Sequence, residues 1–135
     1  MITLEELYGQ WLSHPDATAA RKAASAALLV SVNNLLDEAA QDGVPGLVNP
    51  VTGSQVSGDK YGGFRPQSCP RGAPHSAHKE GRAVDIYDPG NKLDAWLDDD
   101  TLEAFELYRE APASTPHWCH LTDRAPPSGK RTFQP

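Results

Sequence analysis

The sequence of 135 residues predicts an α+β fold, with a small antiparallel sheet flanked by N-terminal and central helices. Two patterns support this prediction. Apolar residues recur at helical spacing in the N-terminal third, and short stretches typical of strands alternate with further helical segments in the second half. The length is that of a single domain, so we expect residues 1–135 to share one core.

Two helices are expected before residue 44. Thr3 and Glu6 form the capping-box pattern of a short helix that ends before Pro15. Asp16 is the expected cap of a longer helix, and Gly43 is its expected stop. The apolar positions that recur along this second helix are Leu28, Leu29, Val32, Leu35, Leu36 and Ala39. Their face should form the main apolar support of the domain.

The remaining elements are shorter. Residues 44–74 are dense in glycine and proline and leave room only for short strands such as "GLV" or "YGGF". A strand is expected in "RAVDIYD", with Val84 and Ile86 on one face and Asp85 on the other, followed by a turn at residues 88–90. Residues 91–110 predict one helix, or two with Asp100 capping the second. "HWCHLT" (residues 117–122) is the last expected strand.

Composition excludes several classes of protein. The net charge of −6 argues against a nucleic-acid partner, and the longest apolar stretch is about half of what a membrane span needs. The N-terminus lacks the pattern of a secretory signal, so we expect synthesis in the cytoplasm and another route of release if the protein acts outside the cell. Cys69 and Cys119 are therefore expected to be free thiols. The tail cations Arg124, Lys130 and Arg131 are either solvent-exposed or line a cleft for an acidic substrate.

Four of the five histidines fall in two clusters, His75 with His78 and His117 with His120. Ordinary polar loops are one interpretation of these clusters, and a metal site is the other. A catalytic zinc needs three protein ligands and one open position. His78 and Asp85 can supply two ligands if Gly81 lets the chain turn sharply between them, and His120 can supply the third. Zinc held in this way lowers the pKa of water to about 7.

The same residues resemble a known family. "SAHKEGRAVD" (residues 76–85) matches the pattern S-x-H-x-x-G-x-A-x-D of the zinc D-Ala-D-Ala carboxypeptidases and L-alanyl-D-glutamate endopeptidases, which cleave peptidoglycan stem peptides. "HWCHL" resembles the second motif of this family, and "YGGFRP" (residues 61–66) is similar to the strand that carries its active-site arginine. The three matches cover about residues 58–122, and the C-terminal "APPSGKRTFQP" looks like the end of small phage-encoded members.

The resemblance implies roles for individual residues. The zinc ligands would be His78, Asp85 and His120. Arg65 would polarise the scissile carbonyl, and Ser76 would contact the substrate or orient the site. His117 stands where many members have an acidic general base, and histidine can do the same work. On a regular strand His117 and His120 face opposite sides, so His117 needs a bulge or a strand that begins after it. The plainer alternatives are a surface ion pair for Arg65 and a turn role for Ser76.

The expected function is that of a zinc metallopeptidase acting on peptidoglycan, as a monomeric phage endolysin or as part of a larger phage particle. The alternative keeps the fold and the zinc without catalysis, as a structural or wall-binding virion module. The departure at His117 motivates this alternative. An apo protein without any metal is a third possibility, and a cysteine hydrolase using Cys119 is a remote one.

Overall fold

The computed structural model describes residues 1–135, and its N-terminal helices follow their sequence signals. α1 (Leu4–Tyr8) begins with the capping box of Thr3 and Glu6 and continues into a 3-10 turn at Gly9–Trp11. α2 (Ala19–Gln41) buries all six of the predicted apolar positions, and Gly43 follows its end with a φ of 89°. The predicted cap is wrong, because the hydroxyl of Thr18 accepts the N–H of Arg21. Asp16, which precedes α2, instead accepts the N–H of Gln67 at 2.8 Å and ties the start of this helix to the loop that contains Gln67.

The sheet has four short strands in the order β1-β3-β2-β4. They are β1 (Ala83–Tyr87), β2 (Tyr108–Glu110), β3 (Trp118–Thr122) and β4 (Thr132–Phe133). The pairs β1–β3 and β2–β3 are antiparallel, whereas β2–β4 is parallel. The α+β prediction is confirmed, but the sheet is mixed rather than purely antiparallel. The cause is the C-terminal segment, which loops back after β3 and runs alongside β2.

Two segments differ from the sequence prediction. Neither "GLV" nor "YGGF" forms a strand; residues 54–64 instead lie as a loop along the outer edge of β1, where Asp85 donates its N–H to Gly62 at 2.7 Å. Within residues 91–110, the alternative of two short helices is confirmed by α3 (Lys92–Trp96) and α4 (Asp99–Ala104), but the cap and the end of the segment differ. Asp98, not Asp100, caps α4 by accepting the N–H of Thr101. The chain then leaves the helical pattern and residues 108–110 become β2.

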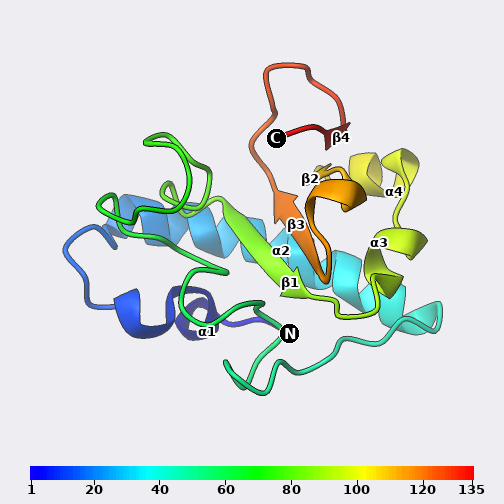
Figure 1. Ribbon diagram of the computed structural model, residues 1–135, viewed down its shortest axis with the longest axis horizontal. Helices are drawn as coiled ribbons and strands as arrows, with labels where there is room; N and C mark the ends of the chain where they lie inside the picture. Colours follow the sequence, from blue (N-terminus) through cyan, green and yellow to red (C-terminus); the bar gives the residue numbers. More distant parts are fainter.

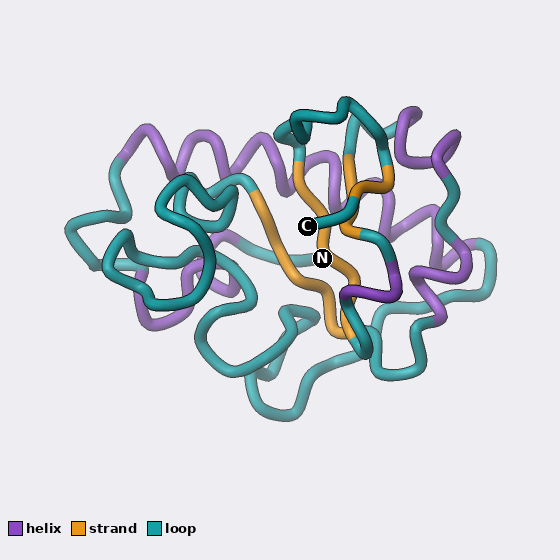
Figure 2. Tube along the Cα trace, turned by 45° about the horizontal axis from the view of Figure 1, so that its top comes forward, coloured by secondary structure: helices purple, strands orange, loops and turns teal.

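The two faces of the sheet have different neighbours. Figure 1 shows α2 passing behind β1 and β3, where Val84, Ile86 and Leu121 join one core of 20 buried residues. The alternate positions, including Asp85 and His120, face away from this core, because successive strand residues point to opposite sides. Figure 2 shows the C-terminal end of the chain returning over the sheet. None of the helices combines the length and the apolar character that crossing a lipid bilayer demands.

Candidate metal centre

His78, Asp85 and His120 come together in the structure, and one potential ligand atom of each lies within 4.8 Å of the others. All three side chains are buried. Asp85 on β1 is paired directly with His120 on β3, so their side chains project from the same face of the sheet. His78 comes from the loop that leads into β1. This group could hold a metal ion.

A glycine turn brings the loop back to the strand between the first two ligands. Gly81 has a φ of 74°, in the left-handed region that glycine adopts without strain. The Ser25 hydroxyl donates to the Gly81 carbonyl at 2.6 Å, and the Tyr8 hydroxyl lies 2.8 Å from Ser25 Oγ. A Cβ at position 81 would lie 2.6 Å from Ser25 Oγ. Helices α1 and α2 therefore hold the turn that places His78, and they leave no room there for a side chain.

Hydrogen bonds set the orientation of the ligand atoms. His78 Nδ1 lies 2.8 Å from the Gly63 carbonyl, which can only accept, so Nδ1 carries the proton and Nε2 is left with its lone pair. That Nε2 lies 3.4 Å from Asp85 Oδ1. His120 Nδ1 lies 2.9 Å from the same oxygen. Two imidazole nitrogens and one carboxylate oxygen thus converge, a donor set that suits a catalytic zinc.

The cluster is strongly coupled electrostatically. Burial by itself raises the pKa of Asp85, but the charges and hydrogen bonds of His78 and His120 outweigh it and hold this pKa well below its usual range. Burial lowers the pKa of His120, whereas the hydrogen bond and charge of Asp85, together with the charge of Glu110, bring it above the ordinary value for histidine. Asp85 is therefore an ionised carboxylate at neutral pH, as a metal ligand must be.

A cleft of about 1040 Å³ opens over the cluster. One wall is the loop of residues 72–78, the floor comes from β1, β2 and β3, and the other wall is the C-terminal segment. Because all three members of the cluster line this cleft, a ligand of peptide size can reach them.

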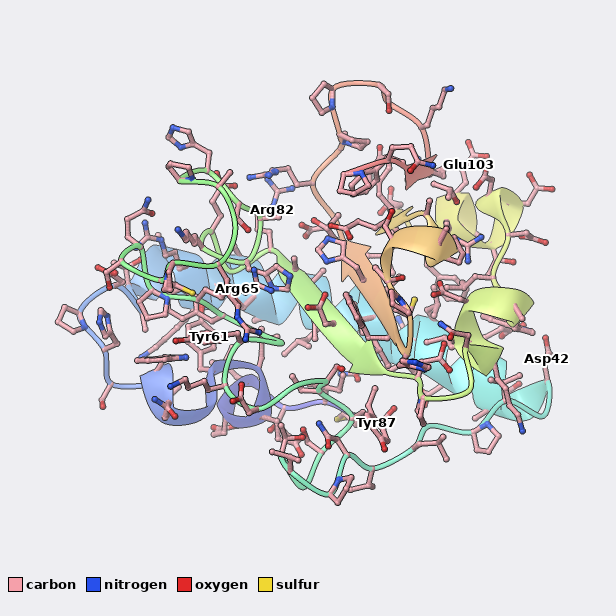
Figure 3. The ribbon with its side chains drawn as sticks, viewed as in Figure 1. Asp42, Tyr61, Arg65, Arg82, Tyr87 and Glu103 are labelled. Atoms are coloured by element: carbon pink, nitrogen blue, oxygen red, sulfur yellow. The ribbon has the colours of Figure 1, made fainter.

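Arg65 and Ser76 lie in the same cleft. Arg65 Nε donates to the Tyr61 carbonyl at 2.7 Å, and Nη2 lies 3.5 Å from Asp85 Oδ2. Figure 3 shows Arg65 and Tyr61 on the loop beside β1. A Cβ on Gly72 would lie 3.2 Å from both Arg65 Nη1 and Ser76 Oγ, so these two polar groups border one small space. The structure thus brings Arg65 to the cluster, whereas Ser76 lies in the wall of the cleft and its hydroxyl accepts the N–H of His78 at 3.3 Å.

His117 is not brought to the cluster. β3 begins at Trp118, so the strand does start after His117, but its φ of 76° turns the residue away from the strand direction. Its ring Nδ1 lies 3.0 Å from the Pro89 carbonyl, and its N–H donates to Asn91 Oδ1 at 3.2 Å. His117 does not line the cleft. Its observed contacts close the connection between β1 and α3.

Glu110 lies at the cluster although the sequence analysis did not select it. It is the last residue of β2 and lines the cleft, and its Oε1 is 4.0 Å from His120 Nε2. The neighbouring Arg109 fixes this strand from the core side, because its guanidinium donates to the Asp94 carboxylate at 3.2 Å and to Thr132 Oγ1 at 3.0 Å. No local signal marked Glu110, since residues 91–110 have the pattern of a helix.

The remaining candidate residues have structural roles or lie at the rim. Both cysteines are free and buried, and burial followed by the nearby Asp94 charge raises the pKa of Cys119 well above its usual value. Asp88 accepts the N–H groups of Leu93 and Asp94, both at 3.1 Å, at the start of α3. His75 is exposed at the rim of the cleft. Of the three tail cations, only Arg124 lines the cleft.

Comparison with profiles of known protein families, with curated protein sequences and with solved structures finds no match for this chain. A functional assignment therefore depends on the geometry of the site and on its sequence motif.

Proposed function

We propose that the protein is a zinc-dependent peptidase that hydrolyses an amide bond in the stem peptides or cross-bridges of bacterial peptidoglycan. The observation that carries this proposal is the buried group of His78, Asp85 and His120 at the floor of a cleft that also holds Arg65 and Glu110. The pattern S-x-H-x-x-G-x-A-x-D supports the substrate class by resemblance. The C-terminal resemblance further supports a monomeric phage endolysin or a virion-associated enzyme.

Zinc fits the residues present. Three side chains supply two imidazole nitrogens and one carboxylate oxygen, and the cleft leaves the remaining side of the cluster open. Catalytic zinc sites have this composition, whereas calcium and magnesium prefer oxygen ligands alone. When bound, zinc would supply a Lewis acid and make hydroxide available at neutral pH.

The side chains around the cluster can perform the rest of the reaction. Arg65 has Nη1 free of the contacts to Tyr61 and Asp85, and this N–H can donate to the scissile carbonyl oxygen as negative charge develops on it. Glu110 can take a proton from water at Oε1 and return it to the leaving amine. Ser76 Oγ accepts the N–H of His78 at 3.3 Å and can donate its own O–H to the backbone of the peptide and so orient it.

The test combines metal analysis with digestion. Purified protein is assayed for bound zinc and incubated with purified peptidoglycan, and the released muropeptides are identified by mass spectrometry. We expect one zinc per protein molecule and the release of new amino groups from the peptidoglycan. Both should be lost in His78→Ala. Both should be kept in His14→Ala, the matched control at a partly exposed histidine. Bound zinc without any released amino group would favour the non-catalytic wall-binding module. Equal product from His78→Ala would contradict the zinc site.

A further inference from the structure

Arg124 is a second cation of the cleft, and the reaction described above does not use it. It follows β3 by two residues and lines the cleft together with His78 and His120. Its side chain is 35% exposed, compared with 14% for Arg65. Arg124 is therefore accessible to a ligand in the cleft while remaining attached to the wall.

The guanidinium of Arg124 is held by one nitrogen only. Nη1 donates to the His75 carbonyl at 2.6 Å and lies 2.9 Å from Glu80 Oε2. Nε and Nη2 have no hydrogen-bond partner in the protein. By contrast, Arg65 uses both Nε and Nη2 in its contacts to Tyr61 and Asp85. Arg124 thus presents the free edge formed by Nε and Nη2, and its anchored Nη1 limits the rotation of that edge.

The charges lining the cleft are distributed unevenly. Its acidic side chains, Asp85 and Glu110, both lie beside His120. The lining residues next to Arg124 carry no acidic side chain; they are Gly72, Ala73, His75, Ser76, Ala125, Pro126, Pro127 and Ser128. Glu80 pairs with Arg124 at Nη1 and does not itself line the cleft, so its carboxylate leaves Nε and Nη2 open to a ligand. This end of the cleft is suited to an anion.

We propose that Arg124 binds a carboxylate of the peptide substrate through Nε and Nη2 and so selects acidic peptides. The inference rests on the proposed peptidase function and adds the chemical class that the cleft prefers. A planar guanidinium with two adjacent donors matches the two oxygens of a carboxylate, which gives a directional, charge-assisted contact. The carboxylate can belong to an acidic side chain or to the C-terminus of the peptide. Arg124 determines specificity and does not touch the reacting atoms.

The effect should fall on binding. A hydrogen bond to a charged group contributes on the order of 1.5–3 kcal/mol, which corresponds to roughly a tenfold to hundredfold change in dissociation constant. Arg124→Gln should therefore raise KM and the dissociation constant for an acidic peptide by about tenfold or more. The value of kcat should stay nearly the same.

The experiment uses zinc-loaded full-length protein and three forms of one stem pentapeptide: with free carboxylates, amidated at the C-terminus, and amidated at the acidic side chain. Calorimetric titration gives dissociation constants without requiring turnover, and kcat and KM are measured alongside. The wild-type protein should bind one amidated form as weakly as Arg124→Gln binds the free acid, which identifies the source of the carboxylate. Lys130→Gln, an equal loss of charge outside the cleft lining, should bind like the wild type.

Glu80→Gln separates ligand binding from a structural role, because it breaks the ion pair and keeps the cation. Retained selectivity in Glu80→Gln together with its loss in Arg124→Gln supports the proposal. Equal loss in both variants, equal binding of all three peptides by the wild type, or binding of none overturns it. Selective binding without hydrolysis would refute the peptidase function and leave Arg124 as the carboxylate site. Hydrolysis of all three peptides without preference would support the peptidase function and refute Arg124 as the carboxylate site.

Discussion

Replacing Glu110 by glutamine tests how protons move in the cleft. The amide has nearly the size of the carboxylate and the side chain is 24% exposed, so the variant should fold. It cannot accept a proton at Oε1. A positioned general base contributes about 10²–10⁴-fold to the rate, or about 3–5 kcal/mol of barrier. We expect kcat to fall by such a factor with zinc content unchanged, because Glu110 lies 4.0 Å from His120 Nε2 and is not a member of the cluster.

His117→Gln is the matched comparison. Its ring contacts the Pro89 carbonyl outside the cleft, so this variant should keep kcat within about twofold and lose about 1 kcal/mol of stability with one hydrogen bond. The assay is initial-rate hydrolysis of a soluble stem peptide, with zinc measured on the same samples. Lost turnover in His117→Gln together with retained turnover in Glu110→Gln would refute the assignment of proton transfer to Glu110.

Three further predictions concern stability. Chelating the metal should lower the midpoint of thermal unfolding, since a ligand at a thousand times its dissociation constant stabilises the fold by about 4 kcal/mol. If chelation lowered the midpoint of His78→Ala by as much as that of the wild type, this would argue against the site. Gly81→Ala should lower the free energy of unfolding, measured in urea, by about 3 kcal/mol, because the strain of a left-handed alanine and the close contact with Ser25 add up. Gly129→Ala, at a similar φ but with open space around the Cβ, should lower it by about 1 kcal/mol. Burial raises the pKa of Tyr8 above its usual value, against the opposing Ser25 hydrogen bond and Arg21 charge. The unfolded chain therefore loses this proton first, so stability is full below a pH of about 10 and falls as pH rises through the folded pKa. Tyr8→Phe should lack that part of the decline in stability at alkaline pH. If the free energy of unfolding of this variant fell with pH as steeply as that of the wild type, the prediction would be contradicted.

The sequence predicted the parts of the site that local patterns encode. A helix with apolar residues at regular spacing, a glycine that must turn the chain and a five-residue strand each leave a signal within a few positions. His78, Asp85 and His120 could be selected because their residue types suit a metal and their segments are short. That Asp85 and His120 are paired across β1 and β3 follows from antiparallel register, which only the folded structure shows.

The parts that were missed depend on distant contacts. β2 has only three residues and lies within a stretch of helical composition, so its pairing with β3 and β4 overrides local propensity. Glu110 was missed with it. His117 was selected because it stands where the resembled family has its general base, but its left-handed backbone and its bond to Pro89 are consequences of the neighbouring turn. The parallel pairing of β4 requires the tail to fold back, which composition does not reveal.

The pairing of Asp85 with His120 also links metal binding to strand alignment. Sliding β3 by one residue against β1 would place Cys119 or Leu121 opposite Asp85 and turn His120 toward α2. The slip that pairs Leu121 with Asp85 leaves the ion only His78 and Asp85 as ligands, so a bound ion would favour the native alignment over that slip. β1 and β3 have five residues each, so few hydrogen bonds contribute to the free-energy difference between the native and the shifted pairing. A bound ion would add to that difference and so help to select the native register.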